Sequence, residues 1–208
     1  MSELNSSQNS QQVKKQSGQM GSWARYYDLI MTLMTFGRED KLRQTTVKLA
    51  RLEPGDRVLE IGCSTGTLSL ASKGQVGPSG EVFGIDIAPE MIAVARRKAT
   101  RKGVDVNFQV GSIAGIPFPD NRFDTVLCSF MIFHMPEDIR LQGFKEIYRV
   151  LKSEGHLFIV DSASKDKRYD VRELAPVLKA NSYTDIESGG MRFALFKGWF
   201  LRVKASKQ

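Results

Sequence analysis

The chain has few cysteines, no long apolar run and no hydrophobic segment near its first residue. Cys63 and Cys128 are the only cysteines among the 208 residues, and both lie in apolar, strand-like stretches. This pattern does not indicate the disulfide framework of a small secreted domain. No apolar run approaches the roughly 20 residues of a membrane helix, and the opening MSELNSSQNSQQ lacks the apolar core of a secretory signal. We therefore expect a globular protein in a reducing, cytoplasmic setting.

The charge balance is positive, with 30 Lys and Arg against 23 Asp and Glu and a formal net charge of +7. Such a balance suits nucleic acid or an anionic membrane surface. The basic residues are scattered over several clusters, however, and no aromatic side chains alternate with them as in nucleic-acid-binding segments. We expect no nucleic-acid partner, whereas a peripheral membrane contact stays open. The carboxylates form no cluster at a spacing that suits a metal ion, so no metal site is predicted.

The composition divides the chain into a tail and one domain. Residues 1–19 are mostly Ser, Gln, Asn and Lys. They cannot bury enough apolar surface to offset their ordering entropy, which predicts a disordered polar tail. Residues 20–208 have the length of a single domain. Its first part, 20–52, carries apolar residues at three- and four-residue spacing, which predicts two helices, one ending near Gly37 and one over 39–52.

From residue 53 onward, short apolar strands alternate with helices. Strands are expected at 57–61, 81–86, 106–110, 124–129 and 155–161, and helices at 67–73, 89–102, 137–151 and 170–179. This alternation is typical of a parallel sheet covered by helices on both faces. Two last strands, 184–188 and 191–204, flank Gly189-Gly190 and predict a hairpin. We expect an α/β, Rossmann-like, doubly wound and mostly parallel seven-stranded sheet with a C-terminal antiparallel hairpin.

The most informative motif is VLEIGCSTGTLSL, residues 58–70, in which a strand, a glycine-containing loop and a helix follow one another. Glycine permits a tight turn and a close approach of a ligand to the main chain. The helix N-terminus offers unpaired N–H groups. Ligands of open α/β sheets bind beyond the carboxyl ends of the strands. The motif therefore predicts a ligand site at the end of this strand.

Two kinds of ligand compete for this site, a dinucleotide and a smaller nucleoside. The dinucleotide fingerprint requires glycine where Ser64 and Thr67 stand. Glu60 would repel a pyrophosphate, but it suits a cationic amino-acid group. Asp86, which ends the next strand in VFGIDIAPEM, can accept hydrogen bonds from ribose hydroxyls. Its alternative role is to cap the helix that Pro89 begins.

Four segments in this order, EIGCSTGT, GIDIAPEMI, GSIAGIPFPDNRFDTVLCSF and LKSEGHLFIVD, resemble the class I S-adenosylmethionine-dependent methyltransferases. The branch that the chain resembles most is that of the ubiquinone/menaquinone biosynthesis C-methyltransferases and their small methyltransferase type 11 relatives. WARYYDLI and GREDKLR are similar to the first helices of that branch. The resemblance covers roughly residues 23–160. It implies S-adenosyl-L-methionine as cofactor, with 20–52 capping the site and 53–208 forming the cofactor-binding sheet.

The resemblance also implies the cofactor-binding residues. They are Glu60, Gly62, Cys63, Thr65 and Gly66 on the methionine side, Asp86, Ile87 and Met91 around the ribose and adenine, Ser112 and Ile113 at the adenine edge, and Ser129 under the sulfonium. Three residues depart from the family pattern. Ser64 stands where a second glycine is usual, Ser112 where Asp or Asn is usual, and Ile113 where a small residue is usual. We expect these departures to weaken cofactor binding.

The implied activity is methyl transfer to a small-molecule acceptor, apolar, aromatic or lipid- and quinone-like. Tyr26, Tyr27, Phe130 and Phe133 are candidates to wall its pocket, or else they only pack the first helix over the sheet. His134 is the candidate catalytic base, because an imidazole titrates near neutral pH. Alternatively, His134 is a capping or structural residue that precedes the helix starting near Pro136. Asp161, at the end of a strand, is a second residue able to touch substrate. A cofactor-binding module without its own catalysis, acting as a partner or regulatory subunit, is the alternative function.

Overall fold

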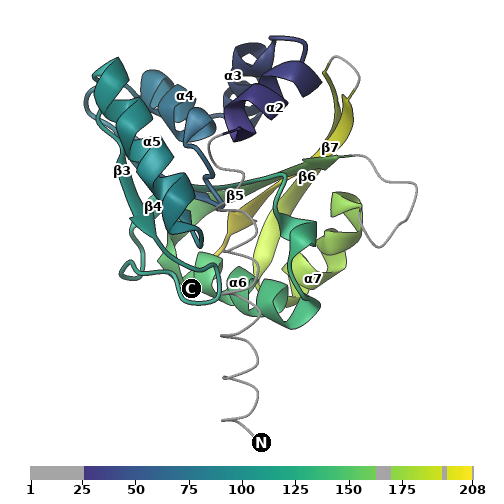
Figure 1. Cartoon of the computed structure of the whole chain (residues 1–208). Coiled ribbons are helices and arrows are strands. Elements are labelled where there is room, and N and C mark those ends of the chain that lie inside the picture. Colours follow the sequence, from purple (N-terminus) through teal and green to yellow (C-terminus); the bar gives the residue numbers. More distant parts are fainter. Residues whose placement is uncertain (1–25, 163–169, 194–195, 208) are drawn as a thin grey trace, which may run out of the picture.

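The computed structural model describes residues 26–162, 170–193 and 196–207, and its centre is one seven-stranded sheet (Figure 1). The strands are β1 (Arg57–Ile61), β2 (Glu81–Asp86), β3 (Asn107–Val110), β4 (Phe123–Ser129), β5 (Leu151–Ser162), β6 (Tyr183–Phe193) and β7 (Phe196–Ala205). Their order is β3-β2-β1-β4-β5-β7-β6. The first five strands pair in parallel, whereas β7 pairs antiparallel with β5 and β6. The predicted fold class is confirmed. The predicted tail, residues 1–19, lies outside the described residues.

Helices cover both faces of the sheet (Figure 1). They are α2 (Tyr27–Met34), α3 (Glu39–Ala50), α4 (Thr67–Val76), α5 (Pro89–Lys102), the short 3-10 helix η1 (Ile132–His134), α6 (Glu137–Val150), the 3-10 helix η3 (Val171–Leu174) and α7 (Ala175–Ala180). The helices α3, α4 and α5 lie on one face, and α6 and α7 on the other. In the described part of the chain, no helix has both the length and the apolar character that crossing a bilayer requires.

Successive residues of the central strand point to opposite faces of the sheet, as β structure dictates. Leu59 of β1 belongs to the core that Phe144 of α6 completes. Val58 belongs to the core on the other face, together with Leu42 of α3. Glu60 shares the side of Val58 because strand side chains repeat every second residue. The fold therefore directs a carboxylate toward α3 at the carboxyl end of β1.

The C-terminal hairpin is present, but the prediction that Gly189-Gly190 forms its turn was wrong. β6 runs on through both glycines to Phe193, where Gly189 pairs with Phe200 and Gly190 with Trp199 of β7. A Cβ at position 189 would lie 2.6 Å from the Phe200 ring. The glycine therefore makes room for a ring of the neighbouring strand, a requirement that is not visible in the local sequence.

The helix predicted over 170–179 is divided into η3 and α7. The Asp170 side chain accepts a hydrogen bond from the Arg172 N–H at 3.0 Å and so begins η3. Pro176 lies in the first turn of α7, where its missing N–H removes no helical hydrogen bond.

Two glycine substitutions test this account of β6. Gly189→Ala should lower the free energy of unfolding by about 1–3 kcal/mol, because the added methyl group overpacks the Phe200 ring. Gly74→Ala in α4 is the control, because a Cβ there meets nothing within 4 Å. It should raise the free energy of unfolding by up to about 1 kcal/mol through helix propensity. Urea unfolding followed by circular dichroism measures both, and equal effects would contradict the explanation.

Candidate functional site

A cavity of about 280 Å³ lies where the carboxyl ends of β1, β4 and β5 meet α2 and α3. This is the edge at which open α/β sheets bind ligands. The predicted residues that line it are Tyr27, Glu60, Gly62, Cys63, Thr65, Ser129, Phe130 and His134. Asp161 lines it as well, so the ends of three strands contribute side chains to one cavity.

The loop after β1 takes the left-handed conformation at three residues. The φ angles are +67° at Gly62, +50° at Ser64 and +76° at Gly66. A Cβ at Gly66 would lie 2.5 Å from the ring of Phe108 on β3, so this glycine lets α4 begin close against the sheet. Ser64 pays a conformational cost as a non-glycine residue at this angle. Its N–H donates to Oδ2 of Asp86 at 2.9 Å, which holds the strained residue in place.

Asp86 fixes the backbone of two segments. Its carboxylate accepts the Ser64 N–H and, at 2.9 Å, the N–H of Ala88, the residue before α5. Asp86 is 4% exposed, and burial raises its pKa while the N–H donors lower it. The capping role weighed against the ribose role is not what the structure shows, because Asp86 binds the N–H of Ala88, which is itself the N-cap residue, and no described side chain caps α5. Ribose binding stays a prediction.

Glu60 is a buried carboxyl group with a raised pKa. The Ser69 hydroxyl of α4 donates to its Oε2. Burial raises the Glu60 pKa to about 7, against the opposing effects of the Ser69 hydrogen bond and the nearby Arg43 charge. Near neutral pH this carboxyl can therefore exchange a proton when a cation approaches.

Three residues around the cavity carry buried polar atoms without a hydrogen-bond partner in the described part of the chain. They are Arg43 with its Nε, Ser129 with its Oγ and Asp161 with its Oδ2. Arg43 is 7% exposed and its guanidinium binds only Glu39 through one Nη atom, at 3.1 Å, among the described residues. An unpaired buried polar group costs about 1–3 kcal/mol. Both a donor and acceptors are therefore available here to a ligand with charges of both signs.

His134 ends η1 and reaches the same cavity as Asp161. Burial raises the Asp161 pKa, while the Ser162 N–H and the proximity of His134 lower it. One Asp161 oxygen accepts the Ser162 N–H at 2.8 Å, and the other is the unpaired Oδ2. An imidazole from η1, which follows β4, and a carboxylate from the end of β5 therefore face the same cavity.

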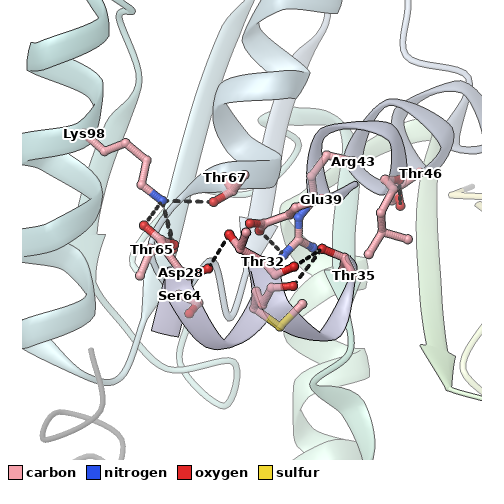
Figure 2. Close-up of polar contacts among 12 residues, drawn as sticks. Asp28, Thr32, Thr35, Glu39, Arg43, Thr46, Ser64, Thr65, Thr67 and Lys98 are labelled. Atoms are coloured by element: carbon pink, nitrogen blue, oxygen red, sulfur yellow. Dashed lines mark hydrogen bonds and ion pairs between the residues drawn. The ribbon is translucent and has the colours of Figure 1, made fainter. Parts of the chain in front are cut away.

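A buried ammonium joins α2 to the loop (Figure 2). Lys98 of α5 is 8% exposed, and its Nζ lies 2.7 Å from Oδ2 of Asp28 on α2. The same nitrogen donates to the hydroxyls of Thr65 and Thr67 at 3.1 and 3.0 Å. The Thr65 hydroxyl donates to Asp28 at 2.6 Å. Because α2, which is described in full, has no buried residue, this polar cluster holds it over the loop.

The other predicted site residues lie away from the cavity lining. Ile113 is 4% exposed and packs against Gly143 of α6, and Phe133 packs on the main core. Tyr26 is 59% exposed on the outer side of α2, so the structure does not place it in a substrate pocket. The remaining predicted residues do not line the cavity: Gly66, Asp86, Ile87, Met91 and Ser112.

Sequence reasoning missed Arg43 as a site residue. Its signal was present, because Arg43 stands three and four residues before the buried Thr46 and Val47 and therefore shares their side of α3. Lys98 was also missed, and it carries no such signal, since its partner Asp28 is 70 residues away.

The raised pKa of Glu60 predicts a pH dependence of stability. Since the folded state holds this proton more tightly than the unfolded state, the stabilisation is complete below about pH 4.5 and is lost as pH rises through 7. Glu60→Gln should remove this dependence. At pH 8, its free energy of unfolding should be up to about 3 kcal/mol higher than that of the wild type. The exposed Glu53→Gln is the control. Urea titrations from pH 5 to 8 measure the difference, and parallel curves for wild type and Glu60→Gln would refute the assignment.

Comparisons with known proteins agree with this geometry. Residues 58–155 match a family model described as a methyltransferase domain. The chain is 37% identical to the demethylmenaquinone methyltransferase of Thermus thermophilus over 135 residues, which are 65% of this chain and 60% of that protein. It is 35% identical to the protein of the same name from Listeria monocytogenes over 138 residues, 66% of this chain and 57% of that protein. The chain thus spans less than two thirds of the length of these curated relatives.

A solved structure supports the fold. A SAM-dependent methyltransferase from Aquifex aeolicus matches with a TM-score of 0.69 and 24% identity, over 89% of this chain and 98% of that chain. The cofactor of the family is S-adenosyl-L-methionine, as the motifs predict. The ordered motifs, the sheet and the matching family model together show a methyltransferase domain with the class I S-adenosylmethionine-dependent fold, and the chain is similar to the quinone methyltransferases over that domain.

Proposed function

We propose that this protein transfers a methyl group from S-adenosylmethionine to a small apolar or aromatic acceptor of the quinone type. The observation that carries the proposal is the set of unpaired polar atoms of Arg43, Ser129 and Asp161 around one cavity, next to Glu60. The amino-acid end of the cofactor carries a carboxylate and an ammonium. The Arg43 guanidinium suits the carboxylate, and the Glu60 and Asp161 carboxyl groups suit the ammonium.

We assign the adenosine end of the cofactor to the predicted residues that do not line the cavity. Asp86 would hold the ribose, since each of its carboxylate oxygens keeps accepting capacity beyond the one N–H it now binds. Ile87 and Met91 would pack near the adenine. The Ser112 hydroxyl already accepts the Ala114 N–H at 3.2 Å. Its second lone pair and its O–H would form hydrogen bonds with the adenine edge. Ile113 would contribute its main chain, because its side chain is buried against α6.

When bound, the cofactor supplies an electrophilic methyl group on a sulfonium. The chain has to orient the acceptor and exclude water. Tyr27, Met31 and Met34 of α2, with Phe130 after β4, give the cavity an apolar wall, and methionine side chains adapt to varied ring shapes. His134 would accept a proton from an acceptor that must lose one, and the neighbouring Asp161 would stabilise the resulting imidazolium. The relatives named demethylmenaquinone methyltransferases make a quinone-like acceptor the first choice.

The role of Arg43 can be tested with two ligands. Arg43→Met, which keeps the length of the side chain, should weaken S-adenosylhomocysteine binding by about 10- to 100-fold, the range for a lost charge-assisted hydrogen bond. Binding of methylthioadenosine, which lacks the amino-acid end, should not change. Isothermal calorimetry measures both, with the exposed Lys48→Ala on the same helix as control. Equal weakening of both ligands would indicate a misfolded site rather than a lost carboxylate contact.

The activity itself is tested with methyl-labelled S-adenosylmethionine and a panel of demethylated quinones, phenols and lipid extracts. We expect labelled product from a quinone-type acceptor. His134→Ala should lower kcat by about 10²- to 10⁴-fold and leave S-adenosylhomocysteine affinity unchanged, as loss of a general base does. Tight S-adenosylhomocysteine binding without product from any fraction would favour a cofactor-binding module over an enzyme.

A further inference from the structure

The outward side of α2 and the turn after it carries a stripe of exposed apolar side chains. We call this the apolar patch; it consists of Tyr26, Leu29, Leu33, Met34 and Phe36, which are 59, 58, 67, 47 and 65% exposed. Four of its members follow one another at spacings of three and four residues, which places them along one side of the helix. Among the described residues, the only other large apolar side chain in this exposed class is Val110 on β3.

The side of the helix next to this stripe faces the cavity. Tyr27 and Met31 line the cavity, Met34 belongs to both surfaces because it lines the cavity and is also exposed, and Asp28 is bound by Lys98. A single helix, about 10 Å across, therefore separates the cavity from whatever the apolar patch touches. Figure 1 shows α2 beside α3 at one end of the molecule.

Exposed basic residues flank the patch. Arg38 and Lys41 follow it directly in the chain. On α5, Arg101 and Lys102 stand three and four residues after Lys98 and so share the side of α5 that contacts α2.

The nearby carboxylates do little to offset this charge. Asp28 is bound to Lys98, and Glu39 is bound to Arg43. Asp40 is exposed and has no cation partner among the described contacts around α2, so it offsets one of the four flanking positive charges. The rim of the patch therefore keeps a net positive charge.

We propose that the apolar patch inserts into the head-group region of an anionic lipid bilayer, with the four flanking basic side chains on lipid phosphates. Interfacial helices bury an apolar side by about 5–10 Å in this way, and basic residues add attraction to anionic lipid. The contact deepens the proposed function on which it rests, because an apolar acceptor dissolved in the bilayer would then meet the cavity beside α2.

The same surface is a poor fit for two other occupants. A symmetric contact with a second copy sets each patch against itself, which brings the basic rims of both copies together. Residues 1–25 join the chain next to the patch, but residues 1–19 are mostly Ser, Gln, Asn and Lys, and residues 20–25 add only Met20 and Trp23 as large apolar side chains.

Co-sedimentation of the full chain with vesicles tests the proposal. We expect binding to phosphatidylcholine vesicles that contain phosphatidylglycerol, and weaker binding to phosphatidylcholine alone. The double substitution Leu29→Glu and Leu33→Glu should lower the partition coefficient at least about tenfold. Val110→Glu, an equally exposed apolar position away from α2, should leave it unchanged. Arg101→Glu with Lys102→Glu should lower binding to the anionic vesicles alone.

Calorimetry with S-adenosylhomocysteine, run on each variant, separates this proposal from the proposed function. Loss of vesicle binding with unchanged ligand affinity supports the patch as the lipid contact. Vesicle binding by the Leu29→Glu and Leu33→Glu variant equal to that of the wild type overturns it. The proposal is also overturned if the wild type does not bind vesicles but forms a dimer, and the Leu29→Glu and Leu33→Glu variant is a monomer. A wild type that binds vesicles but makes no methylated product counts against the proposed function alone.

Discussion

The arrangement over the site depends on one ammonium group, that of Lys98. It lies among Asp28, Thr65 and Thr67, so a single cation joins α5, α2, the loop after β1 and the start of α4. A buried ammonium is tolerated only where charge and hydroxyl oxygens surround it. α2 has no fully buried residue, and Tyr27 is half-buried against the small apolar cluster of Ala88 and Met91. The polar contacts of Lys98 add directional bonds that set the position of the helix against the loop.

Unlike the nitrogen of Lys98, several buried polar atoms around the cavity lack hydrogen-bond partners among the described residues. Arg43, Ser129 and Asp161 keep atoms without partners, and Glu60 is buried with a pKa near 7. None of this favours the folded state when no ligand is bound. Protein sites that bind charged ligands commonly keep such groups, because the ligand supplies the missing partners and the binding free energy includes their satisfaction. The strained Ser64 belongs to the same pattern, held in place by Asp86.

The fold was predictable because its signals are local and repeated. Short apolar runs mark strands buried on both faces, and Pro89 and Gly103 bound α5 at the predicted residues. The loop after β1 was predictable from its glycines. The continuation of β6 through Gly189-Gly190 was not predictable. A glycine pair is typical of a turn, but it also occurs where a ring of the next strand, here that of Phe200, needs room. Contacts between distant residues, such as Lys98 with Asp28, leave no periodic trace in the sequence.

Cys63 lines the cavity in which the methyl donor is proposed to lie. A thiolate at that position would compete with the acceptor, because sulfur anions are strong nucleophiles. Burial and the adjacent Glu60 and Asp86 charges raise the Cys63 pKa well above its ordinary value. The sulfur is therefore kept as a neutral thiol, and the carboxylates proposed to bind the methyl donor also keep the protein's own sulfur from taking its methyl group.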